Sequence, residues 1–179
     1  MAGAVRGSRL SVTGDFGDTG HYNRKVNPWL IAILYCLLGA MAEGVAAGRS
    51  PRVFLKNLVQ PRWAVPQAAW YVIAILYYAI CFATGCRIVM LGPRRTPVLV
   101  SLAAVMLLNA AWNAIFFRAG ALRASLLFYI PYAGAVAALI WLLWPVDRLA
   151  AWSFVVYAAI YLPYAVAWSY SLVRLNARA

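Results

Sequence analysis

Long apolar runs separated by short polar segments dominate the chain. Five of these runs are close to the ~20 residues that a helix needs to cross the hydrocarbon core of a bilayer. They cover residues 28–47, 65–85, 97–117, 124–145 and 149–173. The pattern predicts an all-α integral membrane protein, a bundle of five transmembrane helices, and leaves residues 1–27 as a basic extramembrane N-terminal extension.

Prolines mark where these helices are expected to begin and to bend. Pro28, followed by Trp29, favours a helix start at the membrane surface, and Pro66 is expected in the first turn of the second helix. Pro131 and Pro163 lie in the middle of the fourth and fifth runs. Because a proline inside a helix frees a carbonyl, we expect a kink at each, with concave space between neighbouring helices.

The second half of the first run combines an acid with a stripe of small residues. Glu43 lies within reach of the bilayer, where a charged side chain normally faces a cavity or a partner. Arg49 and Arg52 follow shortly, so we favour pairing with one of them, with a functional site as the alternative. Small residues at every fourth position predict the close approach of another helix: Ala40, Gly44 and Gly48.

The composition excludes a soluble domain. Hydrophobic residues make up 65% of the 179 residues and charged residues 11%, against roughly 45–50% and 25% in soluble domains. The net charge of +12 does not indicate nucleic acid binding, because the basic residues fall at the ends of the apolar runs, where they meet lipid phosphates. Cys36, Cys81 and Cys86 lack the spacing of a disulfide framework or a zinc site.

The distribution of Lys and Arg leaves the orientation in the membrane open, with eight on each side of the predicted spans. Arg6 and Arg9 are far from the first span, and distant charges contribute less to topology. Discounting them favours a cytoplasmic location for the loop 49–62.

Groups that could carry out catalysis are nearly absent. The single histidine, His21, lies in the N-terminal extension, while Glu43 and Asp147 lie near opposite ends of their spans. The sequence has no phosphate-binding glycine loop and no metal-ligand cluster. We therefore expect no enzyme, no metal site and no required cofactor.

Aromatic residues are abundant, with eight Trp and eleven Tyr, several of them deep in the spans. In the third run Asn109, Trp112 and Phe116 share one helix face, which we expect to point into the bundle because an amide in lipid seeks an interhelical hydrogen bond. Such aromatic surface suits a planar or polycyclic apolar ligand. The alternative is that these rings are interfacial and packing residues.

Two stretches resemble signatures of the TspO/MBR family, which includes the tryptophan-rich sensory proteins and the translocator protein. The pattern K-P-x-W-x-P-P-x-x-x-F-x-x-x-W-x-x-L-Y is matched in register by Pro61, Trp63, Pro66 and Tyr78, and Ala74 replaces its second Trp. The pattern N-x-x-W-x-x-x-F-F is matched in full. Its residues here are Asn109, Trp112, Phe116 and Phe117.

The fifth run fits the family less closely. The pattern P-Y-x-x-W can be laid on Val156 and Tyr157 with Ile160, or on Pro163 and Tyr164 with Ala167. Neither frame is complete.

The resemblance implies a five-helix bundle, often a homodimer, with a pocket capped by the first loop. The pocket would bind a porphyrin or another polycyclic lipophile such as a sterol or carotenoid, or lipid, for transport or sensing. Relatives in phototrophic bacteria are linked to tetrapyrrole and carotenoid metabolism, so we expect a bacterial inner membrane protein. Carried over by position, the ligand-binding candidates are Trp63, Asn109, Trp112, Phe116, Tyr78 and Tyr157.

The sequence is compatible with two other functions. The chain could be an accessory or assembly subunit of a larger pigment-containing or respiratory membrane complex, docked through its N-terminal extension and the face carrying Gly44 and Gly48. The second of these alternatives is that the chain is a porphyrin-degrading enzyme that relies on tryptophan redox chemistry.

Overall fold

A computed structural model describes residues 27–48, 51–90 and 95–177, with the side chain of Arg95 excepted. Five helical spans in this part of the chain are long and apolar enough to cross a membrane. They are α1 (Pro28–Ala47), α3 (Gln67–Val89), α4 (Arg95–Asn113) with the π-helix η2 (Ala114–Arg118), α5 (Leu122–Leu127) with α6 (Tyr129–Leu143), and α7 (Arg148–Asn176). The short helix α2 (Pro51–Lys56) follows α1. The predicted five-helix bundle is confirmed, while the extension 1–27 lies outside the described residues except for Asn27.

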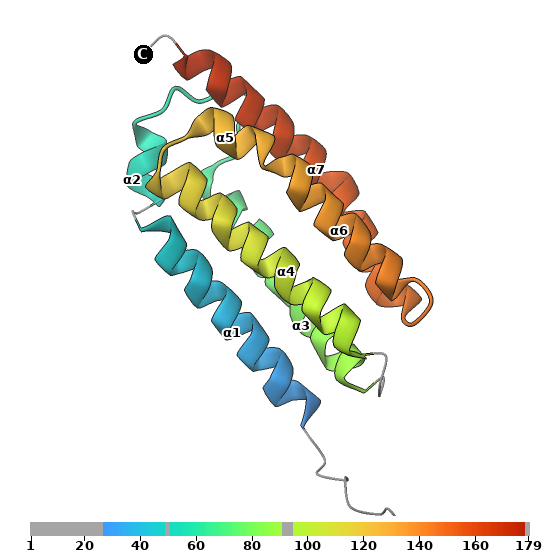
Figure 1. The fold of residues 1–179 in the computed structure, drawn as a ribbon. Helices are drawn as coiled ribbons and strands as arrows, with labels where there is room; N and C mark the ends of the chain where they lie inside the picture. The colour runs from blue at the N-terminus through green and yellow to red at the C-terminus, as the bar shows by residue number, and fades with distance from the viewer. Residues whose placement is uncertain (1–26, 49–50, 91–94, 178–179) are drawn as a thin grey trace, which may run out of the picture.

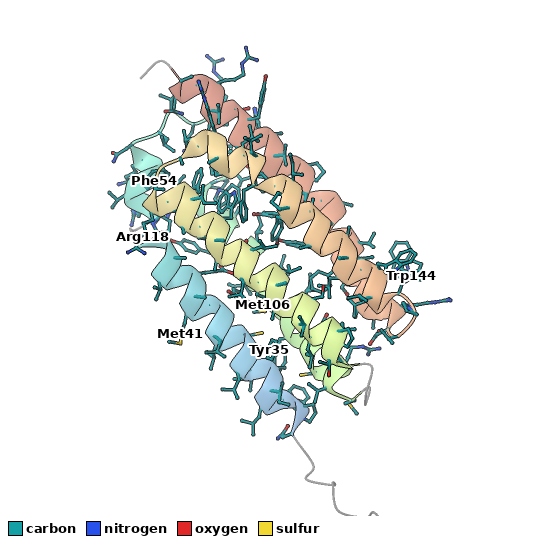
Figure 2. All side chains as sticks on the ribbon, viewed as in Figure 1. Tyr35, Met41, Phe54, Met106, Arg118 and Trp144 are labelled. Atoms are coloured by element: carbon teal, nitrogen blue, oxygen red, sulfur yellow. The ribbon has the colours of Figure 1, made fainter. Side chains whose placement is uncertain are left out.

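The long helices run side by side (Figure 1). Helix α1 packs against α3 and α4, α6 lies between α4 and α7, and α3 also contacts α7. Figure 1 shows α2 and α5 at the end of the bundle where the chain reaches its C-terminus. The outer faces carry large apolar side chains, such as Met41 on α1 (Figure 2) and Trp141 on α6, which is 80% exposed. Lipid is the solvent that such surfaces require.

The ends of α1 follow from its sequence. The Asn27 side chain accepts a hydrogen bond from the amide of Trp29 at 3.0 Å, and Pro28 occupies the first helical position, where its missing N–H is not needed. Gly48 ends the helix with φ +61°, a left-handed conformation that glycine adopts readily. Helix α3 begins directly after Pro66 and runs to Val89, four residues beyond the predicted end at residue 85.

The helices can be compared with the predicted geometry at three places. The fourth span is interrupted at Phe128, between α5 and α6, close to Pro131, where a kink was predicted, because proline cannot donate to the carbonyl four residues earlier. Helix α7, in contrast, is continuous through Pro163. The π-helix η2 was not predicted. At its end, the amide of Ala119 donates a hydrogen bond to the carbonyl of Ala114, five residues earlier.

Two clusters of buried side chains fill the bundle. One lies towards the turn between α6 and α7 and includes Leu102, Leu139 and Phe154, all with no exposed surface. The other lies towards α2 and α5 and includes Phe116 and Trp168. Tight contact of this kind drives helix association in a bilayer, where the hydrophobic effect between helices is absent.

An ion pair joins α3 to the start of α7. The Arg87 guanidinium donates to Asp147 through Nε at 2.5 Å and through an Nη at 3.1 Å, and Asp147 also caps α7 by accepting from the amide of Ala150 at 3.1 Å. Partial burial raises the pKa of Asp147, but the bonds from Arg87 and Ala150 lower it by more, so its pKa lies below the ordinary value. The pair therefore stabilises the fold in its ionised form.

We expect Asp147→Ala to lower the free energy of unfolding by about 1–2 kcal/mol at pH 7, through loss of the helix cap and of a half-exposed ion pair. Because the pKa of Asp147 is lowered on folding, its contribution is complete above the ordinary carboxyl pKa of about 3.9 and is lost as the pH falls through the lowered value. Thermal unfolding followed by circular dichroism between pH 2 and 7 measures this. The difference in stability between wild type and Asp147→Ala should narrow as the pH falls below about 3.9, and a constant difference across the range would contradict the prediction.

Candidate binding cavity

A cavity of about 340 Å³ lies within the bundle, between α1, α3, α4 with η2, and α7, with α2 beside it. This volume falls in the range of roughly 300–1,000 Å³ that small-molecule sites occupy. Nine of the twenty lining residues are aromatic: Trp70, Tyr71, Tyr77, Tyr78, Trp112, Phe117, Tyr157, Tyr161 and Trp168.

Small residues leave the space open. Ala40, Gly44 and Ala74 line the cavity, and a Cβ placed on Gly44 would meet no atom within 4 Å. Within this chain, Ala40 and Gly44 border the cavity, while Gly48 ends the helix. The close approach of another helix to these three residues stays a prediction.

A polar cluster on the cavity wall joins three helices. Glu43 on α1 accepts a hydrogen bond from the Tyr78 hydroxyl of α3 at 2.7 Å and from the Asn109 amide of α4 at 2.6 Å. The favoured pairing of Glu43 with an arginine is wrong for Arg52, whose side chain borders a different hollow. Arg49 lies outside the described residues. Among the described residues, the partners of this carboxylate are interhelical hydrogen-bond donors instead, and both donate to Oε1.

The α4 wall is built from stacked rings. Trp112 lies parallel to Phe116, with ring centroids 4.7 Å apart, and its indole N–H donates to the carbonyl of Ser125 at 3.1 Å. Phe116 is fully buried behind Trp112 and does not line the cavity, whereas the next residue, Phe117, does. Of the residues predicted on this helix, Asn109 and Trp112 therefore face the cavity and Phe116 supports it.

Helix α7 supplies the opposite wall. Tyr157, a predicted candidate, lines the cavity and stacks on Tyr161 with centroids 5.0 Å apart. Trp168 also lines it and lies against Trp70 of α3, with centroids 4.6 Å apart. Trp70 and Trp168 were not among the ligand-binding residues predicted from the sequence. The signal for Trp168 was the Pro163-Tyr164 frame, in which the tryptophan comes one residue later than the family pattern places it.

The loop between α2 and α3 is hydrogen-bonded to the second half of α7. The amide of Val65 donates to the Tyr164 hydroxyl at 3.0 Å, and the Trp168 indole donates to Gln60 at 3.2 Å. Asn176 exchanges two bonds with the backbone of Val59, at 2.9 and 3.1 Å.

Trp63 belongs to this loop but does not line the cavity. Its ring packs edge-on against Tyr164, with centroids 5.6 Å apart, and the side chain is 48% exposed. Its predicted direct contact with a ligand in the cavity is therefore not supported. Trp63 instead packs on Tyr164, the residue whose hydroxyl accepts the hydrogen bond from Val65.

The cavity is electrostatically simple. Among the described residues that line it, Glu43 is the only acid, and none is a lysine, arginine or histidine. In the part of the chain that the structure describes, no group of three metal-ligating side chains comes together. The cavity thus offers aromatic surface, a few hydroxyl and amide groups, and one carboxylate.

The fold and the cavity define a multi-pass integral membrane protein with space for a small lipophilic molecule between its helices. A sequence model of the TspO/MBR family matches residues 32–175, well over half of the chain. The chain belongs to the TspO/MBR family. Comparison with curated proteins found no match. Family membership supports a general role as a membrane translocator or sensor.

Proposed function

We propose that the protein binds a planar or polycyclic lipophile in this cavity, in order to translocate or sense it. A tetrapyrrole fits the proposal best, with sterols, carotenoids and lipid as further members of the class. The observation that carries the proposal is the aromatic wall in which Trp70, Trp112 and Trp168 come from three different helices. Flat rings facing an apolar space favour stacking on a flat ligand.

Access to the cavity is supported by a second hollow at the bundle end near α2. This hollow of about 370 Å³ is bordered by Arg52 and Lys56, and it shares Trp70 and Trp168 with the cavity wall. A lipophile that carries polar groups could place them beside these basic residues, where the helices meet the lipid headgroups. A ligand would then reach the cavity from the membrane surface.

Trp70→Ala should weaken ligand binding by about tenfold, because it removes a stacking surface worth about 1–2 kcal/mol. Trp70 suits the test because its side chain makes no hydrogen bond among the described residues, whereas the indole of Trp112 holds Ser125. The measurement is quenching of tryptophan fluorescence by octaethylporphyrin, a porphyrin without carboxylates, with the purified protein in detergent.

Trp141→Ala is the matched control, because this tryptophan is 80% exposed on the outer face of α6. It should leave the dissociation constant within about twofold of wild type. Equal affinities for wild type and Trp70→Ala, or an equal loss in both variants, would contradict binding in this cavity.

A further inference from the structure

Among the described residues, the two oxygens of the Glu43 carboxylate differ in their hydrogen bonding. Both hydrogen bonds to this side chain, from Tyr78 and Asn109, end on Oε1. Oε2 accepts none from the described residues, and it is not one of their fully buried side-chain atoms without a partner, among which only Tyr77 Oη is found. Since Glu43 lines the cavity, a ligand there can approach the carboxylate.

The described residues around Glu43 supply no positive charge. None of those that line the cavity is basic, and Arg52 and Lys56 border the other hollow. A carboxylate within a bilayer needs a charged partner or strong hydrogen-bond donors, and the two donors present occupy the same oxygen. The missing partner of Oε2 can therefore be brought by the ligand.

The aromatic wall favours the same kind of ligand group. A protonated amine is stabilised by the faces of Trp and Tyr rings as well as by a carboxylate. Tyr78, which bonds Glu43, also lies edge-on to Tyr77, with centroids 5.2 Å apart, so aromatic rings adjoin the carboxylate directly. A carboxylate on the ligand would instead meet Glu43 with like charge.

We propose that Glu43 is the residue that selects the ligand, and that the cavity takes polycyclic or aromatic lipophiles carrying a protonated amine. This inference rests on the proposed function, since it assigns a chemical class to the occupant of the same cavity. The ammonium group would donate to Oε2 while the ring system lies against the aromatic wall. Oε1 keeps its bonds to Tyr78 and Asn109, so the bundle does not rearrange.

The test uses three fluorescent probes with one ring system: 1-pyrenemethylamine, 1-methylpyrene and 1-pyrenecarboxylic acid. The protein is held in nanodiscs of phosphatidylcholine, whose surface carries no net charge, and binding is followed by energy transfer from tryptophan to pyrene. Wild type should bind the amine about tenfold more tightly than methylpyrene, with the acid weakest. Glu43→Gln keeps an oxygen for Tyr78 and Asn109 but removes the charge, and should reduce the preference to about twofold or less.

Asp147→Asn is the matched control, because it removes the other carboxylate of the described residues, far along the chain at the start of α7. It should keep the full preference for the amine. Equal affinity of wild type for the amine and methylpyrene would overturn the role of Glu43 while leaving the proposed function in place, and this comparison needs no variant. An unchanged preference in Glu43→Gln would also overturn it. Absence of any pyrene binding to wild type would overturn both proposals.

Discussion

Replacing Phe116 with alanine should lower the free energy of unfolding by about 3–5 kcal/mol, the range for deleting a buried aromatic ring. Phe116 has no exposed surface, and four rings surround it. Centroid distances are 4.7 Å to Trp112, 4.8 Å to Phe117, 5.3 Å to Phe54 and 5.5 Å to Trp168. Because these rings come from α2, α4 with η2, and α7, removing the central one loosens three parts of the bundle together.

Unfolding of the purified protein in mixed micelles, by increasing the fraction of sodium dodecyl sulfate and following circular dichroism, measures the loss. The control is Trp141→Ala, which deletes a larger ring from the outer face of α6. Lipid or detergent refills that space, so the change should stay below about 1 kcal/mol. A loss for Phe116→Ala as small as that of the control would contradict the central role of this ring.

Gly44→Phe should abolish most ligand binding, with the dissociation constant for octaethylporphyrin rising about 100-fold, or about 2.7 kcal/mol. A Cβ at Gly44 meets no atom within 4 Å, so the phenyl group can enter the cavity without displacing the backbone. It would then occupy part of a space of about 340 Å³ that the ligand needs. Porphyrin quenching of tryptophan fluorescence reports the change.

Gly44→Ala is the matched control. A methyl group leaves the cavity nearly unchanged, and alanine in a helix is favoured over glycine by up to about 1 kcal/mol. This variant should bind porphyrin with a dissociation constant within about twofold of that of wild type. It should unfold at a slightly higher fraction of sodium dodecyl sulfate. Wild-type affinity in Gly44→Phe, with helical content retained, would place the ligand elsewhere on the protein.

Hydropathy and length were sufficient to predict the five spans, because the bilayer imposes the same constraint on every helix. The partners of Glu43 could not be predicted in this way. Tyr78 and Asn109 lie 35 and 66 residues away in sequence, and their contact depends on how α1, α3 and α4 are rotated about their axes. Pairing of Glu43 with the nearest basic residues in sequence was the simpler expectation, and for Arg52 it was wrong.

Phe117 lines the cavity, where Phe116 was predicted, and the reason lies in the local helix geometry. An α-helical spacing of four places Phe116 on the face of Trp112. Both rings indeed stack, but η2 accommodates an extra residue in its turn, and Phe117 reaches the cavity. A π-helix carries no sequence signature strong enough to predict it from one chain.

Several expectations stay predictions. They concern the homodimer, the accessory-subunit role, the bacterial inner membrane, the orientation of the loop 49–62, and the absence of catalysis and of a required cofactor. Porphyrin degradation likewise stays untested.

Hydrogen bonds join the loop 57–66 to α7. All of them reach α7 after Pro163, at Tyr164, Trp168 and Asn176. The loop is therefore coupled to this half of the helix. The loop cannot move away from α7 without breaking four hydrogen bonds. Moving the loop away with these bonds intact would have to carry the second half of α7 with it. Pro163, which lacks the N–H for one backbone hydrogen bond, directly precedes that half of the helix.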